Sequence, residues 1–269
     1  MAFVLDFRSF PVTGGPLAYA PVTWDADLYG IPFYELRCDG AVEDVERALP
    51  AWRQEVQNQG QPALAFTRIQ PSDVRLAAGL SAVGFYPVET TLDISLPLRR
   101  FVRIHPNSAG ARLRRAEAGD VPALVAIAEE TFATDRFHLD PHLPTQLSDK
   151  RYAQWVERGF RDGDHLFVYE STGEAEAQGV MGFYLIRGEP GGEVDLSLAG
   201  VATRYRRGGV GALMYEAMLE MCSEMGYRVA STTVSTNNFD VVNLFMRLGF
   251  VIRSARLTMH LFIGPQPVR

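Results

Sequence analysis

The sequence has few cysteines, and this scarcity argues against two ways of stabilising or equipping a protein. Its 269 residues contain only two, Cys38 and Cys222, which lie far apart and belong to no CxxC or Cys/His cluster. Neither a disulfide framework nor a structural zinc site is implied, so we expect no metal. A reducing, cytoplasmic location fits this cysteine usage.

Long apolar runs and an excess of positive charge are also missing. No window approaches the roughly 18 to 20 apolar residues that a membrane span requires. The N-terminal stretch carries Asp6 and Arg8 among its apolar residues, unlike a signal peptide. The net charge of −6 argues against a protein that coats nucleic acid, because that affinity comes mainly from Lys and Arg at phosphates. We therefore expect neither membrane nor nucleic acid as a partner.

What the sequence does contain is the composition of an ordinary globular protein, 47% hydrophobic and 22% charged. The length favours two domains. The stretch "HPNSAG" interrupts the periodic pattern with Pro, Asn, Ser and Gly and is typical of a linker. We place the boundary near Ser108, which divides the chain into an N-terminal α/β domain, residues 1–108, and a second domain, residues 109–269.

The second half predicts an antiparallel meander followed by a β-α-β-α-β tail. Asp120 is a plausible helix N-cap, with Pro122 in the first turn. The expected elements are a strand at 111–115, helices in "VPALVAIAEETF" and "SDKRYAQWVERGF", strands at 165–170, 179–187 and 194–202, a helix at 209–225, the strand "RVASTTVS", a helix ending at Gly249, and the closing strand "VIRSARLTMHLF".

Two segments of the chain resemble each other. Residues 82–96, "AVGFYPVETTLDISL", and residues 247–261, "RLGFVIRSARLTMHL", share a Gly-Phe pair followed by apolar residues at the same offsets. Either both halves end in the same helix-turn-strand unit, or the likeness is chance over a short window. The first half has no counterpart of the glycine run described next.

The stretch "RYRRGGVGALMYEAMLEMC" places a glycine run at the start of a periodic apolar segment. A glycine cluster that opens a helix is typical of an anion site. A P-loop would need Lys and Ser or Thr after the last glycine, and the run continues with Ala212 to Met214. A dinucleotide fingerprint would need a third glycine where Met214 stands. The remaining pattern is RxxGxG, formed by Arg206, Gly209 and Gly211.

This pattern, directly after a strand and before a helix, resembles the acyl-coenzyme A pyrophosphate loop of the GNAT superfamily of N-acetyltransferases. "LAGVATRY" is similar to that family's fourth strand, and "VSTNNFDVVNLFMRLGF" resembles its last helix. The resemblance implies an α/β (α+β) fold whose central mixed, mostly antiparallel sheet is flanked by helices. A smaller α/β domain that resembles a partial GNAT repeat would precede it. The resemblance also implies acetyl-CoA as cofactor and direct transfer to an amine.

Physical chemistry agrees with an anion at this loop, because first-turn N–H groups lack intrahelical acceptors and the helix dipole favours negative charge. The alternative is a glycine-bearing tight turn with solvated arginines. The residues that the resemblance places at the cofactor are Arg206, Arg207, Gly208, Gly209, Val210, Gly211 and Ala212 at the pyrophosphate, Ala199, Gly200 and Val201 along the pantetheine, and Asn238 and Phe245 on the last helix.

Two features bear on catalysis. A backbone N–H at Gly200 or Val201 would hold the thioester oxygen, and a bulge at Gly200 would suit that role, although a mere strand irregularity explains the glycine as well. Many members of the family protonate the leaving thiolate with a tyrosine, and Phe245 occupies that position here. Either water or a neighbour such as Asn238 or Tyr215 assists, or the activity is impaired.

Both halves are similar to the dTDP-fucosamine acetyltransferases, which acetylate a nucleotide-linked amino sugar: the first half loosely, in "LAYAPVTWDADLYGIPFYELR", and the second half in "DRFHLDPHLP" followed by "DKRYAQWVERG". The resemblance implies Glu89 as a base acting through water; the alternative is a solvated strand residue. Arg136, Phe137 and His138 are expected either to bind the acceptor or to pack structurally.

The expected substrate is therefore a small amine, specifically an amino sugar on a nucleotide, with a protein N-terminus, a lysine or an antibiotic amine as alternatives. A coenzyme A-binding module without catalysis stays open because of Phe245. A homodimer is one expected assembly.

Overall fold

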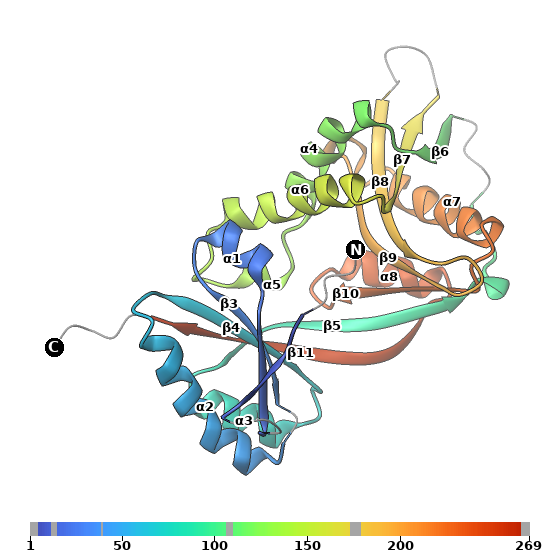
Figure 1. Ribbon diagram of the computed structural model, residues 1–269. Helices are drawn as coiled ribbons and strands as arrows, with labels where there is room; N and C mark the ends of the chain where they lie inside the picture. Colours follow the sequence, from blue (N-terminus) through green and yellow to red (C-terminus); the bar gives the residue numbers. More distant parts are fainter. Residues whose placement is uncertain (1–4, 12–14, 39, 106–109, 173–178, 265–269) are drawn as a thin grey trace. The chain divides into compact units, whose positions relative to one another are not determined.

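The computed structural model describes residues 5–11, 15–38, 40–105, 110–172 and 179–264 (Figure 1). The elements are β1 (Arg8–Phe10), β2 (Leu17–Pro21), α1 (Thr23–Tyr29), β3 (Phe33–Cys38), α2 (Val42–Gln57), β4 (Ala63–Ile69), α3 (Val74–Ala82), β5 (Tyr86–Pro97), η1 (Leu98–Arg100), β6 (Ala111–Arg115), η2 (Ala118–Asp120), α4 (Val121–Thr131), α5 (Arg136–Leu139), α6 (Thr145–Arg161), β7 (His165–Ser171), β8 (Gly179–Gly188), β9 (Glu193–Val201), η3 (Thr203–Tyr205), α7 (Val210–Glu224), β10 (Val229–Ser235), α8 (Phe239–Arg247) and β11 (Val251–Ile263).

The chain forms two compact units that are discontinuous in sequence. The first unit comprises residues 1–91, 136–147 and 255–269, and the second comprises residues 92–135 and 148–254. The predicted boundary at Ser108 falls outside the described residues, and a division into domains at that point stays a prediction.

The first unit is a mixed sheet in the order β1-β2-β3-β4-β11-β5, in which β3 and β4 are parallel. Because side chains alternate across a strand, β4 serves two cores. Ala63 and Ala65 face the core of α2 and α3, which is built around the buried Trp52. Leu64 and Phe66 face the opposite side.

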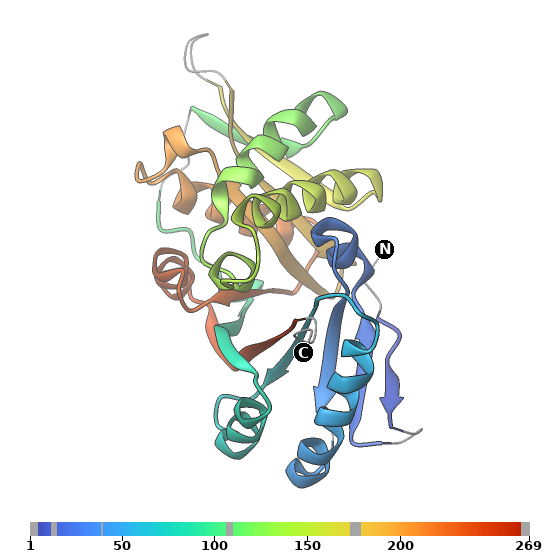
Figure 2. The ribbon, with the colours of Figure 1, turned by 90° about the vertical axis from the view of Figure 1, so that its left-hand side faces the viewer.

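The second unit is a sheet in the order β5-β10-β9-β8-β7-β6, parallel only at β9 and β10 among the pairs whose register is determined. One face packs against α4 and α6, through residues such as Leu124 and Val156. The other face packs against α7 and α8, through residues such as Met214 and Phe245. Figure 2 shows the two helix pairs on the two sides of this sheet. The α/β fold with a mostly antiparallel sheet flanked by helices is confirmed.

The helix-turn-strand likeness between the two halves is also found in the structure. The turns that follow α3 and α8 use Gly84 and Gly249, with φ of 102° and 88°, a region that favours glycine. The phenylalanine that follows each glycine donates its N–H to the carbonyl five residues earlier, at 3.0 Å in both turns, and is buried. In each turn, the phenylalanine therefore packs into the core just before the last strand of its half of the sequence.

Each of those last strands joins the sheet of the other half of the sequence. β11 pairs with β4 of the first unit through seven residues, from Leu257↔Ile69 to Ile263↔Ala63. Residues 92–97 of β5 belong to the second unit, where β5 neighbours β10. Each compact unit thus needs chain from both halves.

Candidate active site

The glycine run forms the N-terminus of α7, as the sequence predicts. Gly209 is the N-cap in a left-handed conformation, with φ of 78°, and no side chain caps the helix. The first helical bond runs from the N–H of Leu213 to the carbonyl of Gly209. Among the described residues, the N–H groups of the first turn before Leu213 therefore have no protein acceptor in their own helix. This end of α7 presents N–H groups that its own helix leaves without an acceptor, together with the positive end of the helix dipole.

The loop leaves room for an anion at these donors. A Cβ built at Gly209 meets no atom within 4 Å, and one built at Gly211 meets only a Val201 methyl, at 4.0 Å. Backbone conformation explains glycine at Gly209, but neither conformation nor packing requires it at Gly211. The exposed loop and the open space over Gly211 fit a diphosphate that must approach the backbone closely.

The arginines of the loop differ in what they contact. Arg206 turns back onto the protein, where Nε donates to the carbonyl of Val201 at 2.9 Å and Nη2 to that of Glu130 at 2.9 Å. Arg206 therefore braces the loop between the end of β9 and the end of α4. Arg207 is exposed and has φ of 65°, unusual for a residue other than glycine. Direct contact of either arginine with phosphate stays a prediction.

The strand before this loop loses its parallel partner. The β9–β10 ladder runs from Val229↔Glu193 only to Ser231↔Asp195, although β9 continues to Val201 and β10 to Ser235. At that point the Thr232 hydroxyl donates to the carbonyl of Leu196 at 2.9 Å, in place of a ladder bond. Beyond it, Ala199, Gly200 and Val201 pair with β8 on one side and have no ladder partner on the β10 side. An extended strip of backbone without a β10 partner results, in which the Val201 carbonyl already accepts a hydrogen bond from Arg206, at the level where the cofactor arm is expected.

The structure corrects the bulge expected at Gly200. The β8–β9 register shifts between Leu185 and Arg187, opposite residues 196–197, while Gly200 pairs regularly with Phe183. Gly200 instead has a packing requirement, because a Cβ there would lie 2.7 Å from the Phe183 ring and 3.0 Å from the Thr131 hydroxyl. Glycine at this position lets α4 approach β9.

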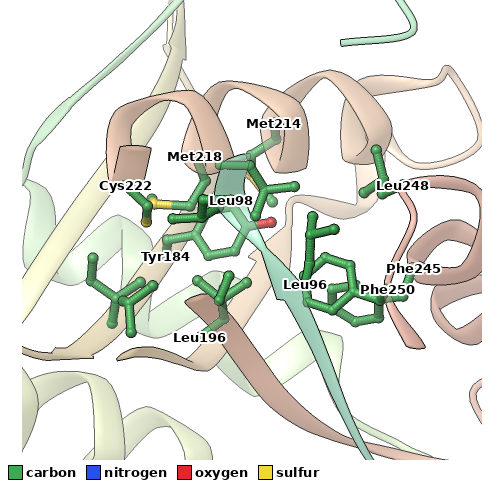
Figure 3. Close-up of a cluster of buried hydrophobic side chains, with 14 of the residues drawn as sticks. Leu96, Leu98, Tyr184, Leu196, Met214, Met218, Cys222, Phe245, Leu248 and Phe250 are labelled. Atoms are coloured by element: carbon green, nitrogen blue, oxygen red, sulfur yellow. The ribbon is translucent and has the colours of Figure 1, made fainter. Parts of the chain in front are cut away.

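The two residues expected on the last helix have clear structural roles. Asn238 is the N-cap of α8, and its Oδ1 accepts the N–H of Val241 at 3.4 Å. Phe245 is 2% exposed, and its ring lies edge to face with Phe250 and with Tyr215. Figure 3 shows Phe245 and Phe250 together beside Leu96. Burial raises the pKa of Tyr215 to about 12, so this hydroxyl keeps its proton at neutral pH. Contact of Asn238 or Phe245 with a cofactor stays a prediction.

The remaining predicted residues lie in the first unit. Glu89 is buried, which argues against the solvated alternative. Arg136 and Phe137 are buried as well: the guanidinium lies 3.8 Å over the Phe66 ring, and Phe137 stacks on Tyr29. This burial favours packing over direct contact with an acceptor. His138 is half-buried.

A buried polar network in the first unit was not anticipated from the sequence. His260 and the side chain of Asp140 are fully buried, with Nδ1 2.6 Å from Oδ2, and Tyr86 donates to the same carboxylate at 2.9 Å. Burial lowers the pKa of His260 to about 4, although the hydrogen bond to Asp140 opposes it. Burial raises the pKa of Asp140, but its hydrogen bonds outweigh burial and hold that pKa below its usual value. No local motif pairs these residues, because 120 positions separate them.

No helix in the described ranges of the chain is long and apolar enough to cross a membrane. No group of three or more His, Cys, Asp or Glu side chains in those ranges could hold a metal ion.

Residues 125–250 match the sequence model of the Acetyltransferase (GNAT) family. Among solved structures, a GCN5-related N-acetyltransferase from Sphaerobacter thermophilus is similar with a TM-score of 0.67 and 14% identity, over 93% of this chain and 78% of that one. A GCN5-related N-acetyltransferase from Kribbella flavida has a TM-score of 0.59 and 18% identity, over 91% and 86%. A tandem GNAT protein from the clavulanic acid biosynthesis pathway has a TM-score of 0.59 and 17% identity, over 88% and 77%. No curated protein matches. The chain has the GNAT fold, and the family match supports an acetyltransferase.

Proposed function

We propose that this chain is an N-acetyltransferase of the GNAT superfamily that moves an acetyl group from acetyl-CoA directly to a primary amine of a small acceptor. The observation that carries the proposal is in the second unit, where the uncapped, glycine-lined start of α7 follows the unpaired end of β9. The first feature suits a diphosphate, and the second suits an extended arm that contains amide groups.

Different residues of the second unit bind the diphosphate, hold the loop, pair with the cofactor arm and stabilise the charged oxygen. The amides of Gly209 to Ala212 bind the diphosphate, and each charge-assisted hydrogen bond contributes about 1.5–3 kcal/mol. Arg206 holds the loop against β9 and α4, and Ala199 to Val201 pair with the arm. Acetyl-CoA supplies an activated thioester. A β9 N–H near Gly200 or Val201 stabilises the oxygen that gains charge, a contribution typically worth about 10²–10³ in rate.

We infer an amino sugar on a nucleotide as the acceptor, supported by the loose resemblance of the first half to acetyltransferases of that kind. A protein N-terminus, a lysine and an antibiotic amine are the alternatives. A binding module without catalysis is a second candidate function. It is favoured by Phe245, which is buried and has no hydroxyl to protonate a departing thiolate.

Two measurements on the purified chain test these proposals. Calorimetry with acetyl-CoA asks whether the cofactor binds. A spectrophotometric assay of thiol release then compares a dTDP-linked amino sugar, D-glucosamine, an unblocked peptide, a lysine peptide and an aminoglycoside. We expect binding, and turnover with the amino sugar. Binding without turnover on any amine would support the binding module, and no binding of acetyl-CoA would overturn the assignment.

A further inference from the structure

Three strands of the second unit meet at one carboxylate that no sequence motif identifies. Asp93, on β5, accepts hydrogen bonds from the hydroxyl of Thr233 on β10, at 2.8 Å, and from that of Ser254 on β11, at 2.7 Å. The two donors engage different oxygens, Oδ1 and Oδ2. Asp93 is half-buried and Thr233 is exposed. The carboxylate is thus held in one orientation at a surface that solvent and solutes reach.

This surface lies away from the core of α7 and α8. Ile94 on β5 and Val234 on β10, the sequence neighbours of Asp93 and Thr233, belong to that core. Side chains alternate across a strand, so Asp93 and Thr233 face the other way. On that face of β10, the hydroxyl of Ser235 donates to the carbonyl of Thr134, in the segment after α4. The carboxylate therefore shares a face with α4 and not with α7.

Asp93 also lies level with the point where β9 and β10 part. Thr233 directly follows Thr232, whose hydroxyl donates a hydrogen bond to the Leu196 carbonyl at the end of the β9–β10 ladder. Paired strands lie about 4.8 Å apart, so β5 and β9, on the two sides of β10, are separated by about 10 Å where the ladder ends at Ser231, and by more beyond it. An amine bound over β10 would lie between the carboxylate and the strip of β9 that begins at Ala199, and water molecules can connect it to Asp93.

We propose that Asp93 receives the proton of the acceptor ammonium, with Thr233 and Ser254 as positioning residues; this inference rests on the proposed function. The ammonium gives one proton to the carboxylate, directly or through water. The amine lone pair then forms the C–N bond to the thioester carbonyl, and the second proton of the nitrogen passes to sulfur as the C–S bond breaks. The products are the amide, the free thiol and one proton that leaves Asp93 for solvent.

The surroundings of Asp93 suit this role. Arg253, the neighbour of Ser254 on β11, donates its Nε to the Ser95 hydroxyl at 2.8 Å. Two hydroxyl donors fix the orientation of the Asp93 carboxylate. An ionised carboxylate attracts an ammonium ion and can accept its proton. Glu89, the residue expected from the sequence, belongs to the first unit and is buried.

The experiment uses the full chain, acetyl-CoA, and the panel amine that the unmodified enzyme turns over fastest. We expect Asp93→Asn to lower kcat by about 10²–10⁴-fold, the range for a lost general base. Calorimetry should show unchanged acetyl-CoA affinity. The same amine, titrated below its own pKa into the coenzyme A complex, should bind on the order of tenfold more weakly, because a charge-assisted bond is lost. Asp162→Asn, at an exposed aspartate after α6, is the matched carboxylate-to-amide control and should leave kcat within a few-fold.

A second variant separates positioning from folding. Thr233→Val removes a hydrogen bond to the ionised form, so the pKa of Asp93 should rise and the acid limb of kcat should move to higher pH. Thr233→Ser should restore the original limb. If Asp93→Asn or Thr233→Val folds and keeps the kcat and pH profile of an active parent enzyme, the inference is wrong while the proposed function stands. If the parent enzyme binds no acetyl-CoA, the proposed function itself fails.

Discussion

The buried pair of His260 and Asp140 should make the first unit sensitive to acid above pH 4. In the folded chain His260 stays neutral, since its pKa lies at about 4, whereas the imidazole of an unfolded chain takes up a proton below about pH 6.5. Protonation therefore favours the unfolded state. The stability contributed by this depressed pKa is complete above pH 6.5 and is lost as the pH falls toward 4.

The size of the loss follows from the shift. A shift of about 2.5 pH units, at about 1.4 kcal/mol per unit, gives roughly 3 kcal/mol. His260 is fully buried, so no solvent screening reduces the figure. Asp140, whose pKa is depressed, adds its own loss only at lower pH, below the usual carboxyl range. The window between pH 6.5 and 4 thus belongs to the imidazole.

The assay is urea unfolding at a series of pH values, followed by tryptophan fluorescence. In a Trp155→Phe background the remaining tryptophans, Trp24 and the buried Trp52, belong to the first unit and report on it. His260→Asn keeps an amide donor for Asp140 but cannot titrate. It should be less stable at pH 7 by a few kcal/mol, since a buried charge loses part of its hydrogen bonding, and its unfolding free energy should change less with pH. Parallel pH slopes in His260→Asn and its parent would refute the reasoning.

Two further predictions concern the second unit. Gly200→Ala should cost about 1–3 kcal/mol of unfolding free energy, because its methyl would press on Phe183 and Thr131, whereas Gly211→Ala, with open space at its Cβ, should be near neutral in the same urea experiment. Phe245→Tyr should raise kcat by up to about 10²-fold if expulsion of the thiolate limits turnover. Loss of coenzyme A binding in calorimetry would mean instead that the buried Phe245 ring is needed only for packing.

Local features of the fold could be predicted from the sequence. Apolar periodicity and turn residues located the strands and helices of the second half, and the Gly-Phe pairs marked two similar turns at Gly84 and Gly249. The glycine run located the start of α7 because the N-cap has a left-handed conformation, which favours glycine, and Gly209 occupies that position. Such features depend on residues that are close in sequence, and a sequence pattern contains this information.

Features that depend on pairing over long distances could not be predicted. The exchange of β5 and β11 between the halves leaves no trace in periodicity, because each strand keeps the same alternation whichever partner it has. The register shift in β8 opposite residues 196–197 could be predicted only if the pairing register of β8 and β9 were known. The inward turn of Arg206 and the cluster around Asp93 likewise arise only when separate strands meet.

The most direct test of the central claim is calorimetry of acetyl-CoA with Gly211→Asp. This substitution places a carboxylate in the open space where the diphosphate would lie, and Gly211, unlike Gly209, has no left-handed backbone to strain. Gly110→Asp, also at a glycine with open space around its Cβ, is the matched control for the added charge. The account predicts that Gly211→Asp folds and loses binding by at least about tenfold while Gly110→Asp binds as the parent does. Equal affinity in all three proteins would contradict it.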